Sequence, residues 1–400
     1  MSLLELLYSN ILKPGGLLIL NQKYMPDKQK VLVASSLHPW DDPRIFYKEC
    51  HSLKKHYDIT LVAVGEQESF YKDNIRIIGL SKSESIFGRL ANAVKIIREL
   101  LIGKYAIFHF HDPELLWVGL IAKLFAKKVI YDIHENILGV VQMRNWIPKI
   151  IKKPLGIFIL LLEKITPIIF DGVLLSEKSY LKHFRKNNNI IIVQNFVEVD
   201  SYRIVQSKPK DHTIIYVGAV TYSRGILDLV KAVVELQKNN PTIKLIIIGR
   251  LPNQKFKRKL HDVINSAPSP ENIQILGHIN FLQLNKYVST ATIGVIPLHS
   301  NDNYLFSYPT KIFDYMNWGL PFVYTDIPYW KETFGEKCGG VSFKACDKID
   351  LIKKIEKILY DEYLWSQLSR NCRKNIQKFN WNTEEIKLLQ LYNDINGTNR

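Results

Sequence analysis

The feature that most constrains the fold of this 400-residue chain is a repeated succession of short β-branched apolar runs and helix-length amphipathic segments. In the first half, the apolar runs predict strands at residues 31–35, 59–64, 106–110, 128–133 and 172–175. The amphipathic segments predict helices at residues 44–56, 87–102, 113–125 and 147–165. Continuous apolar strands that alternate with helices are typical of a parallel sheet covered on both faces.

The same succession starts again near residue 213. Its apolar runs predict strands at residues 213–217, 243–248, 273–276, 293–297 and 321–324. Helices are predicted at residues 226–237, 255–264, 282–290 and 311–317, and the tail at 347–395 is predicted to be mainly helical with a break at 379–381. Ligands of such sheets bind at the carboxyl ends of the strands, so the loops there carry the candidate sites.

We therefore predict an α/β protein with two Rossmann-like domains and a cleft between them. The parts of the chain are an N-terminal extension at 1–29, a first domain at 30–198, a second domain at 199–378, and a final helix at 379–400.

Composition and charge narrow the class of protein. Apolar residues make up 46% of the chain and charged residues 23%, which is the balance of a folded globular protein. The formal net charge of +16 favours anionic partners such as nucleotide phosphates or acidic lipids, and no nucleic-acid-binding motif is present. The four cysteines lack metal-binding spacing, no secretory signal is evident, and no apolar run is long enough to span a membrane. We therefore expect a cytoplasmic protein with no nucleic-acid partner.

A candidate anion site lies at residues 306–323, where a loop enters a helix at Pro309. The first turn of a helix presents unpaired N–H groups and partial positive charge, which suit a diphosphate. Lys311 adds a full charge, and Asp314 follows where it can accept hydrogen bonds from ribose hydroxyls. The alternative is an ordinary amphipathic helix whose lysine and aspartate are solvated.

A second candidate segment runs over residues 216–226. Gly218 ends the predicted strand and lets the backbone approach a ligand, and Arg224 precedes a helix and can pair with phosphate oxygens. The spacing is weak in isolation. It gains weight because Gly249 and Gly277 end the next two strands in the same way.

A third candidate segment, His109 to Asp112, follows a predicted strand of the first domain. Histidine at such an edge can bind a sugar hydroxyl or act as a base. We expect the two histidines, His109 and His111, to face opposite sides of the strand, so that one of them points into the cleft. Asp112 before Pro113 is interpreted as the cap of the following helix.

Two further loops of the first domain carry polar side chains. Asp132, His134 and Glu135 follow one strand, and they either brace the loop against His111 or lie near an acceptor. Asp42 is predicted to cap the next helix, and Arg44 in its first turn either meets an acceptor phosphate or is exposed to solvent.

The segment P-T-K-I-F-D-Y-M-N-W-G-L-P at 309–321 resembles the donor-site helix of retaining group 1 (family 4) glycosyltransferases, in the branch that makes polysaccharides. In that branch it reads P-x-K-x-x-E-Y-M-x-x-G-x-P. Asp314 stands where the family usually has glutamate, and the first acid of the family's pair would fall at Phe306. The segments at 109–114 and 132–135 are similar to H-x-H-D-P-E and D-x-H-E of the same branch.

The resemblance implies a GT-B fold whose final helix crosses back onto the first domain. It implies a nucleotide-diphosphate sugar as donor, transfer with retention to a glycan or lipid-linked acceptor, a role in surface polysaccharide synthesis, and no cofactor or essential metal. It favours His111 over His109 and makes His111, Arg224 and Lys311 the catalytic candidates. The donor-binding residues would be Gly218, Arg224, Gly249, Gly277, Ser307, Thr310, Lys311 and Asp314. Acceptor-side candidates are Asp42, Arg44, Asp132, His134 and Glu135.

Residues 145–186 combine eight lysines and arginines with interleaved apolar side chains. This pattern suits docking on the anionic inner face of the cell membrane, or a core-facing helix with a basic rim. Two other functions fit the fold class. A GT-B epimerase would keep the sugar and need no acceptor, and a catalytically degenerate relative would bind the donor without turnover.

Overall fold

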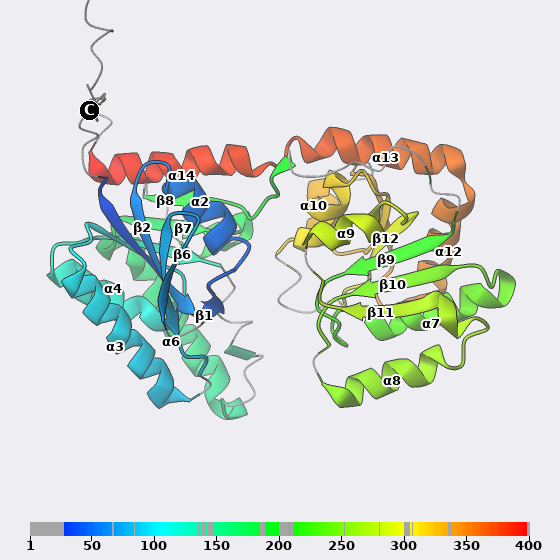
Figure 1. The fold of residues 1–400 in the computed structure, drawn as a ribbon, viewed down its shortest axis with the longest axis horizontal. Coiled ribbons are helices and arrows are strands. Elements are labelled where there is room, and N and C mark those ends of the chain that lie inside the picture. Colours follow the sequence, from blue (N-terminus) through cyan, green and yellow to red (C-terminus); the bar gives the residue numbers. More distant parts are fainter. Residues whose placement is uncertain are drawn as a thin grey trace, which may run out of the picture.

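The computed structural model contains two α/β lobes that lie side by side, with a helix of the C-terminal tail lying along the first lobe (Figure 1). It describes residues 28–65, 68–83, 85–134, 137, 141–142, 147–184, 189–199, 208, 211–251, 253–279, 281–299, 305, 307–334 and 338–397. The predicted extension at 1–29 therefore lies almost wholly outside the described residues. Among the helices that the structure describes, none combines the length and apolarity that a membrane span needs.

The N-terminal lobe is built on an eight-stranded sheet in the order β3-β4-β2-β1-β5-β6-β7-β8. Its strands are β1 (Lys30–Pro39), β2 (Asp58–Val64), β3 (Ser69–Lys72), β4 (Ile75–Leu80), β5 (Ile107–Phe110), β6 (Lys128–Ile133), β7 (Gly172–Leu175) and β8 (Ile190–Ile192). All neighbours are parallel except β3 and β4. The five predicted strands are present. The edge strands β3 and β8 and the interior strand β4 were not predicted.

The helices of this lobe divide between the two faces of its sheet. They are a π-helical segment at Ile45–Cys50 that continues into α2 (His51–Leu53), α3 (Ile86–Ile102), a 3₁₀ turn at Pro113–Leu115 followed by α4 (Leu116–Leu124), and α6 (Lys149–Ile169). Right-handed crossovers place α3, α4 and α6 on one face. On that face lie Phe108 and Phe110, whereas Ile107 and Ile130 pack with the π-helical segment and the final helix on the other.

The C-terminal lobe is a six-stranded, fully parallel sheet in the order β11-β10-β9-β12-β13-β14. Its strands are β9 (Thr213–Val217), β10 (Lys244–Ile248), β11 (Ile273–Gly277), β12 (Ile293–Ile296), β13 (Phe322–Thr325) and β14 (Gly340–Phe343). Its helices are α7 (Ile226–Asn239), α8 (Gln254–Ile264), α9 (Phe281–Val288), α10 (Thr310–Asn317), α11 (Pro328–Phe334), α12 (Lys348–Tyr360) and α13 (Glu362–Ile376). The five predicted strands and four predicted helices of this half are all present.

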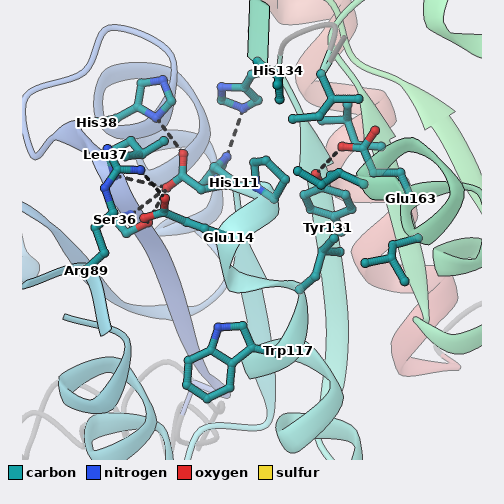
Figure 2. Close-up of a pocket in the computed structure, with 18 of the residues that line it drawn as sticks. Ser36, Leu37, His38, Arg89, His111, Glu114, Trp117, Tyr131, His134 and Glu163 are labelled. Atoms are coloured by element: carbon teal, nitrogen blue, oxygen red, sulfur yellow. Dashed lines mark hydrogen bonds and ion pairs between the residues drawn. The ribbon is translucent and has the colours of Figure 1, made fainter. Parts of the chain in front are cut away.

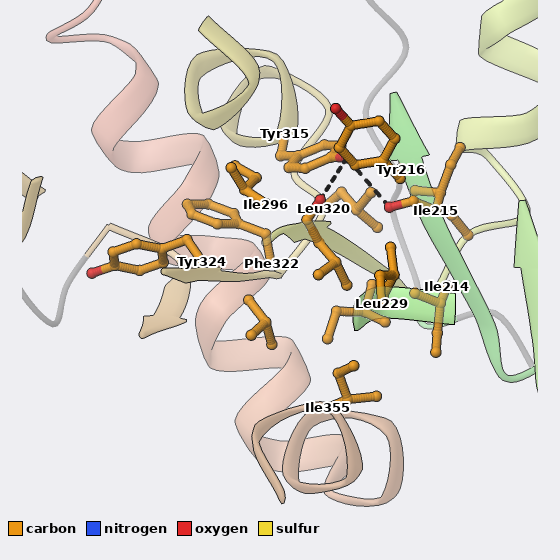
Figure 3. Packing of buried hydrophobic residues seen from close by; sticks show 14 of the residues in the cluster. Ile214, Ile215, Tyr216, Leu229, Ile296, Tyr315, Leu320, Phe322, Tyr324 and Ile355 are labelled. Carbon is orange, nitrogen blue, oxygen red and sulfur yellow. Dashed lines mark hydrogen bonds between the residues drawn. The ribbon is translucent and has the colours of Figure 1, made fainter. Parts of the chain in front are cut away.

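One continuous apolar core fixes the position of α10 in this lobe (Figure 3). Tyr315 is fully buried, and its hydroxyl donates to the Ile215 and Val295 carbonyls at 3.3 and 3.5 Å. Because these carbonyls belong to β9 and β12, the middle of α10 is held against the sheet. The first turn of α10 then projects beyond the carboxyl ends of the strands.

The final helix, α14 (Trp381–Asn396), lies on the N-terminal lobe (Figure 1). The Trp381 indole donates to Ser52 Oγ at 3.1 Å, and Glu384 accepts a hydrogen bond from the Gln194 amide at 2.8 Å. The last described helix thus crosses back onto the N-terminal lobe, as the resemblance implied.

Candidate functional site

Three strand-end glycines bring backbone and a lysine together at the carboxyl edge of the C-terminal sheet. Gly218 follows β9 with a φ of +143°, and a Cβ there would collide with the Lys311 side chain. Gly249 follows β10 with a φ of +157°, and a Cβ there would collide with the Gly218 carbonyl. The Gly249 amide donates to the Gly277 carbonyl at the end of β11, at 2.7 Å. Any other residue at the first two positions would displace Lys311 or its neighbour.

Two cations and a helix start meet at this edge. Burial and the nearby Arg224 together lower the pKa of Lys311 to about 8, with Asp314 opposing the shift. Burial raises the pKa of Asp314, and Lys311 opposes that shift. The N-terminus of α10 has no side-chain cap, so its first amides stay available to an anion. Arg224, Lys311 and the start of α10 therefore form a positively charged corner. The sequence predicted that the two segments carrying these residues would be neighbours.

The loop before α10 is held in place by a hydrogen bond from α11. The Trp330 indole donates to the Ser307 carbonyl at 2.7 Å, and Thr310 begins the helix with an exposed side chain. Phe306 and the polar residues at 301–303 lie outside the described residues. Ser307 and Thr310 therefore flank Pro309 at the start of α10.

Two side chains that the sequence did not single out connect the lobes. Glu177 follows β7 and accepts a hydrogen bond from the Tyr308 amide at 3.0 Å, and burial raises the pKa of Glu177 to about 8. Burial lowers the pKa of Lys48 to about 8, and Asp314 of the other lobe is the strongest influence that raises it. The carboxyl edges of the two sheets therefore face each other. Glu177 was detectable from its place at a strand end, whereas Lys48 lies within a predicted helix that gives no such signal.

His109 of β5 and His111, which directly follows the strand, contradict the expectation that they face opposite sides. Their rings lie 4.7 Å apart, because residues two apart on a strand point to the same face. His109 is bonded through Nδ1 to the Tyr392 hydroxyl at 2.8 Å. His111 lies next to His134, with 2.9 Å between Nδ1 and Nε2, and burial lowers the pKa of His111 well below its ordinary value. His111 is therefore a neutral, buried ring, and it lies at the edge of a cavity in the N-terminal lobe.

Asp112 occupies the N-cap position before Pro113, as predicted, but its side chain does not cap the helix. Its side chain makes no cap hydrogen bond and instead accepts from Ser35 Oγ at 2.9 Å and from the Ser36 and Leu37 amides at 2.6 and 3.2 Å. Burial alone would raise the pKa of Asp112, but hydrogen bonds from His38 and Ser35 lower it overall. The carboxylate therefore ties the carboxyl end of β1 to the turn after β5, because its oxygen accepts from groups of β1 rather than from its own helix.

Both alternatives for Arg44, an acceptor phosphate and solvent, are also wrong. The guanidinium is buried, lies 2.7 Å from Glu49 and 3.0 Å from Asp132, and donates to the Val193 carbonyl at 2.8 Å. Burial would lower the pKa of Arg44, but Asp132 and Glu49 raise it overall. Asp42 accepts from the Arg44 amide at 2.9 Å and so caps the helix start as predicted.

Asp132 and His134 form the bracing network that was one of their two interpretations. Asp132 Oδ2 lies 3.1 Å from His134 Nε2 and 3.8 Å from His111 Nδ1. Burial would raise the pKa of Asp132, but Arg44 holds it well below its usual range. Glu135 lies outside the described residues.

Glu49, His111, Asp132 and His134 bring potential metal ligands within 4.8 Å of one another. The Arg44 guanidinium already contacts both carboxylates of this group. A divalent ion there would face that guanidinium at short range, so the donor set fits an ion-pair network better than a metal centre.

A cavity of about 620 Å³ opens beside His111, within the N-terminal lobe (Figure 2). Its polar wall includes Ser36, His38, Arg89 and Glu114. Its apolar wall comes from α4, β6 and α6 and includes Leu116, Trp117, Ile133, Leu155, Ile159 and Leu162. The volume lies within the range of roughly 300–1,000 Å³ typical of small-molecule sites.

The sequence is similar to those of known glycosyltransferases. Residues 200–379 match the family model of the glycosyl transferases group 1. The capsular polysaccharide biosynthesis glycosyltransferase CapM of Staphylococcus aureus is 22% identical over 358 residues, which are 85% of this chain and 90% of that protein.

Solved structures show the same fold. Sucrose-phosphate synthase from Thermosynechococcus elongatus superposes with a TM-score of 0.73 at 18% identity, over 93% of this chain and all of that one. Anabaena Alr3699/HepE in complex with UDP and glucose superposes with a TM-score of 0.69 at 12% identity, over 92% of this chain and 100% of that one. The chain has the GT-B fold, and its resemblance to group 1 glycosyltransferases is confirmed. The match to the family model lies in the C-terminal lobe.

Proposed function

We propose that the chain transfers a sugar from a nucleotide-diphosphate sugar to a glycan or lipid-linked acceptor, with retention, during surface polysaccharide synthesis. The observation that carries the proposal is the convergence of Arg224, Lys311 and the first turn of α10 at the interlobe edge. CapM is named for capsular polysaccharide biosynthesis, and the HepE structure holds UDP and glucose, which supports a nucleotide-sugar donor here.

The chemistry follows from where charge develops. As the glycosidic bond to the diphosphate breaks, negative charge builds on the leaving oxygen, and preorganised cations and amides stabilise it. Arg224, Lys311 and the α10 amides supply that stabilisation, so the proposed reaction needs no metal or other cofactor. The acceptor hydroxyl attacks from the face that the diphosphate leaves, which retains the anomeric configuration.

Asp314 and His111 take different parts in the proposal. Asp314 is the ribose contact, since it follows Lys311 on α10 and lies close enough to Lys48 and Lys311 to influence the pKa of each. His111 is neutral and buried, so it orients the sugar or its neighbour His134 instead of serving as an obligate base.

The outer side of α6 supports a place at the inner face of the cell membrane. Apolar side chains along one helix face are exposed to solvent, namely Ile150, Ile157, Phe158, Leu161, Ile165 and Ile168. Lys149, Lys153 and Lys164 lie on the same helix, whereas Lys152 is buried and donates to the Gln142 carbonyl. An exposed apolar face beside lysines favours an anionic lipid surface.

A thermal-shift screen with UDP-, GDP-, dTDP- and CMP-sugars tests the donor site. Binding to the folded state raises the melting temperature, so one nucleotide class should stabilise the wild type and not Lys311→Ala. Lys331→Ala, which removes a surface lysine paired with Asp326, is the matched control and should respond like the wild type. Stabilisation by no nucleotide sugar, or equal stabilisation of Lys311→Ala, would contradict the proposal. Product analysis after incubation with donor alone separates transfer from epimerisation.

A further inference from the structure

The cavity of the N-terminal lobe has two chemically different ends (Figure 2). Ser36 and His38 lie at the carboxyl end of β1, on the edge that faces the other lobe. Away from this edge the lining is hydrocarbon, supplied by Leu116 of α4 and by Leu155 and Ile159 of α6. A ligand that fills the cavity must therefore be polar at one end and apolar at the other.

The one acid of the apolar wall is held in a form that suits hydrocarbon. Glu163 is 3% exposed and accepts a hydrogen bond from the Tyr131 hydroxyl at 2.8 Å. Burial raises the pKa of Glu163 to about 7, so a large fraction carries its proton at neutral pH. A protonated, hydrogen-bonded carboxyl adds little polarity to the wall.

The polar end carries cations. Lys82 and Arg89 line the cavity, and Arg89 lies 2.8 Å from Glu114, which also accepts from Ser36 Oγ at 2.6 Å. His38 is 3.4 Å from the buried Asp112 carboxylate. Two permanent cations at the mouth favour an anionic headgroup, with the carboxylate of Glu114 holding Arg89 in position.

The apolar end continues onto the surface of the lobe. Trp117 lines the cavity and is 39% exposed, and it shares α4 with the exposed Leu120 and Leu124. α4 and α6 lie on the same face of the sheet, so the exposed face of α6 belongs to the same side of the molecule. A hydrocarbon chain passing from a bilayer on this side into the cavity stays in contact with apolar side chains.

We propose that this cavity binds the hydrocarbon chain and phosphate of a phosphate-bearing amphiphile, which is the lipid-linked acceptor of the proposed transfer. The chain lies between α4 and α6, and the phosphate lies by Lys82 and Arg89. This placement directs the headgroup toward the interlobe edge where the donor corner lies. The role of this amphiphile as acceptor rests on the proposed function, whereas its binding in the cavity does not.

Calorimetric titration with farnesyl phosphate and dodecyl phosphate, each below the concentration at which it aggregates, tests the site. Both should bind the wild type, whereas glycerol phosphate and inorganic phosphate should not, because they lack the chain. Preference for farnesyl over dodecyl phosphate assigns an isoprenoid acceptor, and the reverse assigns an acyl-type chain. Binding of inorganic phosphate as tight as that of the amphiphiles would overturn the proposal.

Leu155→Glu places a charge in the apolar wall and should weaken farnesyl phosphate binding at least about tenfold. Ile386→Glu is the matched control, since it places the same charge on the exposed side of α14, away from the cavity and from α6, and it should bind as the wild type does. If Leu155→Glu fails to fold, Ile159→Trp fills the cavity without a charge and should give the same loss. Equal binding of farnesyl phosphate by the wild type and the cavity variants would overturn the site. A dimer that the α6 substitutions abolish, together with no binding of either amphiphile, would also overturn it.

Nucleotide-sugar stabilisation of the same variants separates the two proposals. Leu155→Glu should keep it, because the donor corner lies in the other lobe. Amphiphile binding without any nucleotide-sugar response would leave the lipid site standing and remove the proposed transfer. A nucleotide-sugar response without amphiphile binding would support the donor site and remove the proposed lipid site.

Discussion

The two lobes share an architecture but use charge in opposite ways. In the C-terminal lobe, Arg224 and Lys311 lie close enough to repel each other, and Asp314 partly counters the charge of Lys311. In the N-terminal lobe, the Arg44 guanidinium lies between Glu49 and Asp132 and is fully enclosed by them. A cation pair that remains unfavourable until an anion arrives is suited to binding, whereas a neutralised buried cluster is suited to holding loops in place.

Removing Arg44 should give the largest effect and should act on stability. Arg44→Ala leaves two buried carboxylates without their cation, so we expect a loss of about 3–5 kcal/mol in the free energy of unfolding. Arg76→Ala breaks the partly exposed pair with Glu99 and should cost less than about 1 kcal/mol. Urea denaturation measures both, and a loss for Arg44→Ala as small as that for Arg76→Ala would mean that the network is not structural.

Glu163 should make the stability of the N-terminal lobe depend on pH. Its pKa rises from 4.5 to about 7 on folding, so its contribution is complete below pH 4.5 and is lost as the pH approaches 7. The loss is about 3 kcal/mol, and Glu163→Gln, which keeps an acceptor for Tyr131, should not show it. Urea midpoints of both proteins at pH 4.5, 6 and 8 check this, and parallel profiles would rule out the buried acid as the cause.

Arg224→Ala should act on the reaction and not on the fold. Removing one group that stabilises the leaving diphosphate should lower kcat/KM by about 100-fold, or about 2.7 kcal/mol. The melting temperature should stay near that of the wild type, because Arg224 is only partly buried. Arg258→Ala on the exposed side of α8 is the control. A large drop in melting temperature for Arg224→Ala would place this residue with Arg44 and erase the contrast between the lobes.

The smallest effect should come from the outer face of α6. Leu161→Glu exposes a charge where the membrane is proposed to lie, and it should weaken flotation with anionic vesicles by about tenfold, or about 1.4 kcal/mol. Binding to neutral vesicles serves as the reference for the contribution of the lysines. Unchanged flotation of the variant would show that α6 does not face lipid.

Local features of the chain made the C-terminal lobe predictable. Gly218, Arg224 and Lys311 each lie in a short segment whose spacing already indicates a phosphate site, and every predicted strand of that half is present. The orientation of His109 and His111 was predicted wrongly, because residues two apart on a strand point to the same face and not to opposite faces.

The sequence by itself determined two parallel sheets and a helix start flanked by cations, because periodicity and turn chemistry act between near neighbours. Only the tertiary structure decided that Asp112 binds the carboxyl end of β1 instead of its own helix, and that Arg44 pairs with Asp132, 88 positions further along the chain. Their partners Ser35 and Asp132 lie on β1 and β6, and the sheet order that brings these groups together depends on packing of the whole lobe. The cavity between α4 and α6 likewise exists only once both helices cover one face of the sheet.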